Sequence, residues 1–358
     1  MTTVDRRGLG GRLGSTELVY LALLGVLVIG AVLVAVDGGN LFGTANLVDM
    51  LTRSSLLGFV ALGQTFVILC GSLDLSVGYV MALCSLVGAT TMAGDPAKVP
   101  LGIAAVLVVA AGIGLLNGLI VSVLKVNPFI ATLGMGLIIK GYLDTNYKGP
   151  AGAVPSSFQQ FGYSRIGFLP VSTAVMLIAV VLGILYLRRT RTGFHMFAVG
   201  GSQDVARLSG IRTGRVLVTA HVLCSVAAGV AGLLIAARFG TGSALVYGSG
   251  YDLDSIAAVV LGGTLLMGGR GGIAGTLAGV LILAVLDTVF NILQVDPFFK
   301  DVLRGVVIIA AVAIYARRQI DRRASRPRFG PDGNGGPPGP PRDPAPDEPV
   351  PAGRGADR

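Results

Sequence analysis

Long apolar runs separated by short polar stretches dominate the first 316 residues of the chain. A helical run of about 17 to 25 apolar residues is long enough to cross the hydrocarbon core of a bilayer. Ten such spans can be drawn, at residues 18–36, 48–69, 75–93, 101–124, 129–147, 168–187, 216–238, 254–267, 273–293 and 302–316. Glycines and polar residues interrupt the second, third and eighth. The pattern predicts an all-α polytopic membrane protein with about ten transmembrane helices.

Composition supports this class. Of 358 residues, 53% are hydrophobic and only 13% are charged, whereas soluble domains carry about 25% charged residues. The net charge of +9 comes from basic residues outside the spans, and such residues mark cytoplasmic segments of membrane proteins. They gather in the N-terminal segment 1–17, in the loop 188–215 and directly after residue 316. With ten spans, all three lie on one side, so we expect a multi-pass membrane protein with both termini cytoplasmic.

The chain changes character at its C-terminal end. From residue 324 to residue 358, proline and glycine alternate with charged residues and apolar residues are scarce. Such a composition cannot bury a core. We expect a disordered tail that follows a transmembrane domain at 18–316 and that the function of this domain does not require.

Motifs for catalysis or metal binding are missing from the sequence. It contains no phosphate-binding loop, no nucleophile elbow and no H-E-x-x-H motif. Cys70, Cys84 and Cys224 lack metal-ligand spacing, and the two histidines are isolated in the sequence. We therefore expect neither an enzyme nor a metal site.

One carboxylate stands between apolar runs, in the stretch CGSLDLSVG at residues 70–78. Gly71 breaks the second span, so Asp74 lies where a new helix begins. Its oxygens can accept the free backbone N–H groups of Leu75, Ser76 or Val77. The same position, at the cytoplasmic end of a helical hairpin, also suits a gate or a proton site.

Other polar groups inside the spans are candidates for a solute pathway. Gln64, Asn117 and Asn291 qualify, although hydrogen bonds between helices explain them equally well. Asp287 and Arg304 are predicted to form an ion pair, because an unpaired charge in the bilayer is costly and both lie near the same membrane surface. Glycines four residues apart, such as Gly114 with Gly118 and Gly275 with Gly279, predict closely packed helices.

The largest basic loop contains a short predicted helix. Ser202 can cap it, Asp204 suits its first turn, and Gly210 can end it. Val205, Ala206 and Leu208 give it an apolar side. Because so short a helix is marginal alone, we expect it to dock on a partner or to lie against the protein's own cytoplasmic face.

Four blocks carry a family resemblance: GQTFVILCGSLDLSVGYVMAL (63–83), NPFIATLGMG (127–136), GSQDVARLSGI (201–211) and YDLDSIAAVVLGGTLLMGGRGGIAGTLAG (251–279). In this order they resemble the membrane permease subunits of ribose- and xylose-type sugar ABC importers, over residues 45–316. The resemblance implies a permease of the bacterial cytoplasmic (inner) membrane, similar to those of type II importers, which moves a monosaccharide.

The same resemblance implies partners. Two permease chains, expected as a homodimer in membrane lipid, pair with ABC ATPase subunits and receive sugar from an extracytoplasmic binding protein, with no role for nucleic acid. ATP and Mg²⁺ are then used by the ATPase, and this chain binds no cofactor. The coupling helix of the family matches Ser202, Asp204, Val205, Ala206, Arg207, Leu208 and Ser209. Similar permeases often carry an amide near position 287, so Asp287 departs from the pattern.

A proton-coupled secondary transporter of a small polar solute is the alternative. Asp74, Asp144 and Asp287 would then be its candidate proton sites. Uptake that requires ATP but survives collapse of the proton gradient would indicate the ABC importer.

Overall fold

The computed structural model describes residues 15–296, 298, 299, 302, 305 and 306. Its α-helices are α1 (Ser15–Val36), α2 (Thr44–Leu69), α3 (Val77–Met92), α4 (Val99–Ser122), α5 (Pro128–Asn146), α6 (Ser156–Tyr163), α7 (Val171–Arg189), α8 (Arg191–Gly201), α9 (Gln203–Leu208), α10 (Thr213–Phe239), α11 (Tyr251–Leu261) and α12 (Ile273–Ile292). Two 3₁₀ helices, η1 (Pro96–Lys98) and η2 (Ala244–Ser249), and a hairpin of β1 (Arg165–Ile166) and β2 (Leu169–Pro170) complete it.

This all-α bundle confirms the predicted class of a multi-pass membrane protein. A helix occupies each of the first nine predicted spans. In the described residues, 7 helices are long and apolar enough to cross a bilayer, and α3 is a shorter apolar helix. Most of the tenth span, Arg304 included, lies outside the described residues, as does the predicted tail at 324–358.

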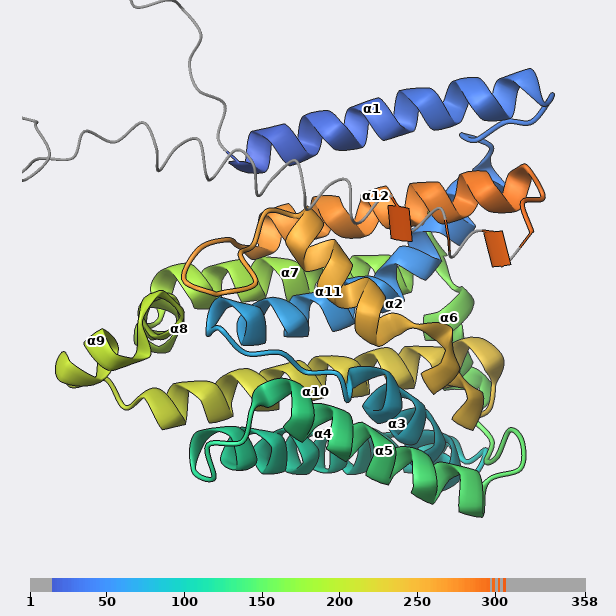
Figure 1. Cartoon of the computed structure of the whole chain (residues 1–358). Coiled ribbons are helices and arrows are strands. Elements are labelled where there is room, and N and C mark those ends of the chain that lie inside the picture. Colours follow the sequence, from blue (N-terminus) through green and yellow to red (C-terminus); the bar gives the residue numbers. More distant parts are fainter. Residues whose placement is uncertain (1–14, 297, 300–301, 303–304, 307–358) are drawn as a thin grey trace, which may run out of the picture. The chain divides into compact units, whose positions relative to one another are not determined.

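Helices α2 and α10 form the centre of the bundle (Figure 1). The apolar window of α2 is 83% buried and that of α10 is 78% buried. Helix α4 crosses α10 closely, since a Cβ on Gly118 would lie 2.6 Å from the Cα of Val218 and one on Gly114 would lie 2.6 Å from the carbonyl oxygen of His221. The predicted small-residue packing is confirmed here. Gly268, Gly271 and Gly272 lie in the turn between α11 and α12.

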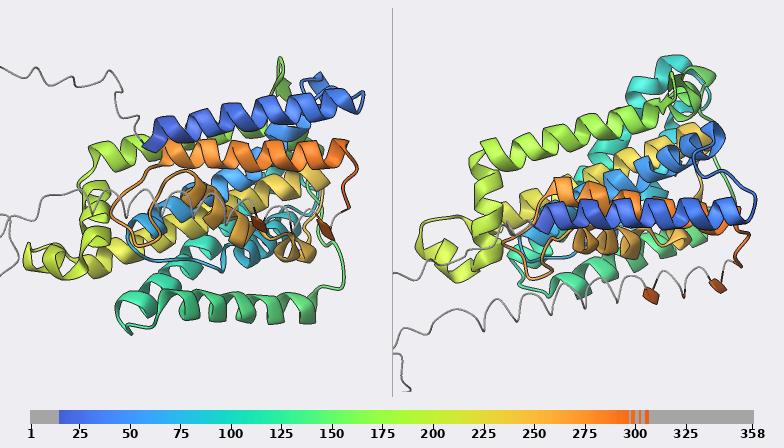
Figure 2. Two further views of the ribbon diagram at one scale, coloured as in Figure 1. Left: turned by 45° about the horizontal axis from the view of Figure 1, so that its top comes forward. Right: turned by 90° about the horizontal axis from the view of Figure 1, so that it is seen from above.

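Helix α1 lies at the edge of the bundle, along α12 (Figures 1 and 2). Val19, Leu23 and Val34 face α12, whereas side chains such as Leu24 and Ile29 are exposed. An apolar exposed face on a spanning helix suits contact with lipid tails.

Helix α3 is too short to cross a membrane, and so is α11 without η2, with which it forms one of the 7 spans (Ala244–Leu261). Their 16 and 11 residues extend about 24 Å and about 17 Å, against a hydrocarbon core of about 30 Å. A non-helical segment at residues 70–76 completes the pass of α3, and the segment 240–250, which contains the 3₁₀ helix η2, completes the pass of α11. Such segments persist in a membrane only when protein groups satisfy their backbone.

The two ends of the bundle differ. Helices α8 and α9 project from one end, between α7 and α10 (Figures 1 and 2). Helix α6 and the β1–β2 hairpin lie at the other end, where Gly162 of α6 packs against the backbone of Arg238 near the end of α10. We call these the α9 end and the α6 end.

Candidate functional site

The predicted short helix is α9, and its termini form as expected. The hydroxyl of Ser202 accepts the backbone N–H of Val205 at 3.4 Å, Asp204 lies in the first turn, and Gly210 has a φ of 80° just after the helix. The Ser202 side chain therefore caps the N-terminus of α9, and a glycine in the left-handed backbone conformation follows its C-terminus.

The apolar side of α9 divides into two parts. Ala206 is only 3% exposed and packs into the main core, whereas Val205 is 62% exposed and Leu208 is 89% exposed. Asp204, Arg207 and Ser209 are also exposed. Ala206 anchors the helix to its own protein, and the tip formed by Val205 and Leu208 is available to a partner.

Helix α8 connects this tip to the helix break after α2. A Cβ on Gly200 would overlap the carbonyl oxygen of Leu69 and the backbone nitrogen of Gly269. Those two groups share a hydrogen bond of 3.0 Å. A Cβ on Gly268 would in turn lie 2.6 Å from the nitrogen of Gly71. Three chain segments thus meet backbone to backbone, and we call Leu69, Gly71, Gly200, Gly268 and Gly269 the glycine junction.

Asp74 is fully buried just beyond this junction. Its Oδ1 accepts the backbone N–H of Ser76 at 2.9 Å and the Ser76 hydroxyl at 2.6 Å. Its Oδ2 accepts the amide of Asn117 at 3.4 Å. The backbone N–H of Leu75 goes elsewhere, to the Thr132 hydroxyl at 3.0 Å. The predicted capping is therefore present at Ser76, in the turn that leads into α3.

A histidine also contacts this carboxylate. His221 Nδ1 lies 3.3 Å from Asp74 Oδ2, and His221 Nε2 lies 3.1 Å from the Ser72 hydroxyl. The expectation that both histidines are isolated is thus wrong for His221. Ser72 is 2% exposed, and His221 and Asp74 are 0% exposed. A substrate therefore cannot reach this Ser–His–Asp arrangement. It joins the broken segment to α10 as a buried polar network.

Asn117 and Gln64 lie on either side of α10. Asn117 donates to Ser76 at 2.9 Å as well as to Asp74, and Gln64 Oε1 accepts from the Cys224 thiol at 3.4 Å. Both side chains are fully buried. The structure therefore gives them contacts between helices, and it brings Asp74 together with Asn117 but not with Gln64. Whether either also meets a solute stays a prediction.

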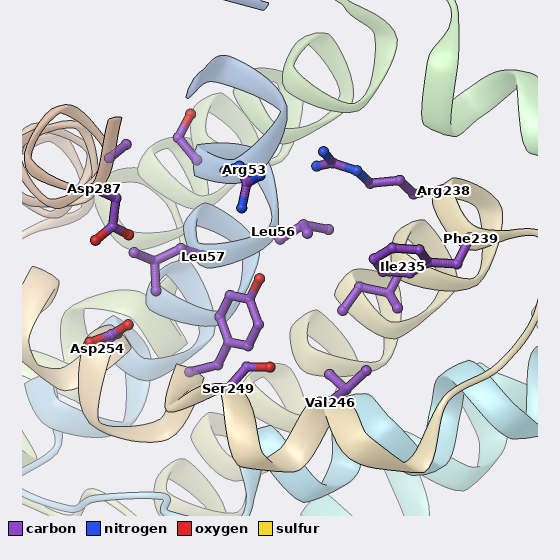
Figure 3. A pocket seen from close by; sticks show the side chains of 13 residues that line it. Arg53, Leu56, Leu57, Ile235, Arg238, Phe239, Val246, Ser249, Asp254 and Asp287 are labelled. Atoms are coloured by element: carbon purple, nitrogen blue, oxygen red, sulfur yellow. The ribbon is translucent and has the colours of Figure 1, made fainter. Parts of the chain in front are cut away.

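Asp287 lies in the other half of the bundle, in a cavity of about 400 Å³ between α2, α10, α11 and α12. Figure 3 shows Arg53 and Arg238 on one side of this cavity and Asp254 and Asp287 on another. Asp49, beside the cavity, pairs with Arg53 at 2.6 Å and with Arg238 at 3.0 Å. The predicted pair of Asp287 with Arg304 involves a residue outside the described part. Asn291 is exposed and does not belong to the Asp74 network.

Sequence reasoning missed His221 and Asn117 as partners of Asp74, and it missed Ser72 and Thr132, which bond to His221 and to the Leu75 N–H. A histidine inside an apolar span was a signal, because ionisable groups in spans usually have a partner. The sequence did not identify that partner, which lies 147 positions away.

Comparison with known proteins gives a consistent result. Residues 46–312 match the model of the family described as branched-chain amino acid transport system / permease component. The chain is 37% identical to the ribose import permease protein RbsC of Escherichia coli K12 over 83% of this chain and 94% of that protein. It is 37% identical to RbsC of Bacillus subtilis 168, over 79% and 88% of the two chains, and 34% identical to the galactose/methyl galactoside import permease protein MglC of E. coli K12, over 84% and 97%. No solved structure matches the chain.

Proposed function

We propose, from the premise that this chain belongs to the branched-chain amino acid transport system permease family, that it is the membrane subunit of an ABC importer for a monosaccharide. The support is the similarity to ribose and galactose import permeases along nearly their whole length. The substrate is then a pentose or hexose, and its capture from outside belongs to a separate binding protein.

Helix α9 is the element that would receive the ATPase. Its exposed Val205 and Leu208 form an apolar tip, and Arg207 and Arg212 beside it are also exposed. A protruding tip of this kind suits a cleft in a partner that moves during ATP hydrolysis. Because Ala206 fixes α9 to the bundle, a movement of the tip would be passed to α8 and the glycine junction.

The partners follow from this role. Two copies of the chain would enclose the pathway as a homodimer in the lipid bilayer, and ATP and Mg²⁺ would be bound by the ATPase subunits, with no cofactor on this chain. The α9 end would face the cytoplasm, since the arginines of loop 188–215 gather there. The broken segment around Asp74 would then be a gate on the cytoplasmic half of the pathway.

Reconstitution tests the proposal. The permease, its ATPase and its binding protein are placed in proteoliposomes, and uptake of labelled ribose and galactose is followed. We expect uptake that requires ATP and the binding protein and that persists with a protonophore. Uptake without ATP would refute the ABC assignment.

A proton-coupled transporter is the second candidate, and the buried contact of Asp74 with His221 is the observation that favours it, because such pairs can carry protons in membrane proteins. In that case a protonophore would abolish uptake and removal of ATP would not.

A further inference from the structure

The segment 240–250 runs back into the bundle beside α3. Its Ser243 N–H donates to the Ser85 hydroxyl at 3.2 Å, in the middle of α3. Four residues later, the ring of Tyr247 stacks on the ring of Tyr79 near the start of α3, with centroids 5.5 Å apart and planes at 20°. The segment 240–250, which includes η2, therefore approaches α3 inside the bundle.

This approach occurs near the middle of the membrane. Tyr79 packs against α5, where a Cβ on Gly136 would lie 2.6 Å from its ring. Gly136 is about 12 Å from the Pro128 end of α5 and about 15 Å from the Asn146 end. Interrupted helices that meet at this depth are typical of transporter binding sites.

A charged pair lies next to the two rings. Lys140 Nζ is 2.5 Å from Asp144 Oδ2 and 5.4 Å from the centroid of the Tyr247 ring. The Tyr247 hydroxyl donates to Asp144 Oδ1 at 2.7 Å. The side chains of Lys140 and Asp144 are 40% and 43% exposed. Tyr79, Tyr247, Lys140 and Asp144, which we call the α5 strip, run along α5 from its middle toward the α6 end.

The α5 strip is not suited to contact with lipid tails. A charge at membrane depth costs several kcal/mol unless it faces water or protein, and Lys140 is about 9 Å from the nearer end of α5. Its ammonium is held against Tyr247, so it does not extend freely toward the membrane surface. The opposite side of α5, with exposed Ile138, is apolar and needs no water.

We propose that the α5 strip is a sugar-contacting wall of the transport pathway. This inference rests on the proposed function and identifies where a monosaccharide meets the chain. The carboxylate, the ammonium and the phenol hydroxyls offer hydrogen-bond acceptors and donors to sugar hydroxyls. The stacked rings form a rigid apolar surface at the point where η2 packs on the start of α3.

The first test removes both charges together. Lys140→Met with Asp144→Leu avoids an unpaired charge and would be harmless if the strip lay against lipid or a second chain. We expect sugar transported per ATP hydrolysed to fall about tenfold, the effect of one lost hydrogen bond to a charged group. The matched control, Asp95→Asn with Lys98→Met, removes an exposed pair at η1 and should transport normally. Equal transport per ATP by both variants would overturn the proposal.

The second test does not depend on transport rate. The native cysteines Cys70, Cys84 and Cys224 are buried, so a membrane-impermeant charged thiol reagent will report on an introduced cysteine. Lys140→Cys in the assembled transporter should react, and ribose or galactose at high concentration should slow the reaction. Ile138→Cys, about 160° away around α5, should stay unreactive. A Lys140→Cys protein as unreactive as Ile138→Cys, or one that sugar does not protect, would refute the sugar contact.

Different results would contradict the proposed function and the proposed sugar contact of the α5 strip. If the wild-type complex moves no pentose or hexose with ATP, ribose and galactose included, the proposed function is wrong. If it moves one of them while the α5 strip variants behave as the controls do, the function stands and this wall is wrong.

Discussion

Gly200 offers the sharpest test of how α9 communicates with the membrane. Replacing it with alanine puts a methyl group against the Leu69 carbonyl and the Gly269 nitrogen, which are hydrogen-bonded to each other at 3.0 Å. These are backbone atoms, so no side chain can rotate away to make room. The junction must open, and the hydrogen bond that closes it is strained or lost.

The size of the effect follows from three contributions. Overpacking costs about 1–3 kcal/mol, loss of one hydrogen bond costs about 1 kcal/mol, and alanine gains up to about 1 kcal/mol over glycine in a helix. We expect Gly200→Ala to lower the free energy of unfolding by about 1–3 kcal/mol. Because the junction joins α8 to α2, the larger loss should be in coupling between ATP hydrolysis and sugar uptake.

The neighbouring residue supplies the control. A Cβ on Gly201 meets nothing within 4 Å, so Gly201→Ala makes the same chemical change in the same helix without the overlap. Both variants are compared by thermal unfolding in detergent and by sugar uptake per ATP in proteoliposomes. Equal unfolding temperatures and equal coupling in the two variants would show that the close contact at Gly200 has no role.

Three further changes have definite expected outcomes. Asp74→Asn keeps a cap for Ser76 but cannot accept hydrogen bonds at both positions, so unfolding should become easier by about 1–3 kcal/mol; unchanged stability would indicate that only one oxygen matters. Leu208→Asp should abolish stimulation of the ATPase without altering thermal unfolding, because Leu208 is 89% exposed. Ala206→Asp should reduce both ATPase stimulation and the unfolding temperature. Normal ATPase stimulation in the Leu208→Asp variant would exclude docking at the tip of α9. A chain truncated after residue 324 should transport as the full chain does, measured by the same uptake assay.

The spans could be predicted because burial in lipid demands long apolar runs, a requirement visible in any one segment. Each of the first nine predicted spans contains a helix. The break at Gly71 and the cap of α9 at Ser202 were also predictable, since caps and breaks depend on residues within one turn. The division of α9 into a buried Ala206 and an exposed Leu208 was not, because it depends on what packs around the helix.

Contacts between distant segments account for most of what the sequence did not reveal. The stretch 240–250 has neither helical nor strand periodicity, and its return into the bundle depends on pairing with other segments, such as the bridge between Ala151 and Gly242. His221 is a lone polar residue in an apolar span until the fold brings it to Asp74. Asn291 resembled a pathway residue because it is polar within an apolar run, yet it lies at the exposed end of α12.

The positions of these features suggest why the second span is interrupted where it is. The segment that follows Leu69 touches α8 through the glycine junction, then bonds to α10 and α4 through Asp74, and then starts α3 beside the tyrosines of the α5 strip. A continuous helix here would fix all three contacts in one rigid rod. A stretch of a few non-helical residues can change its backbone angles between the glycine junction and Tyr79. The N–H groups of Leu75 and Ser76 are hydrogen-bonded to Thr132 and Asp74, so this stretch keeps partners for its backbone inside the membrane. If the ATPase docks on α9 as proposed, a displacement of α9 would therefore reach the middle of the membrane along a single short segment.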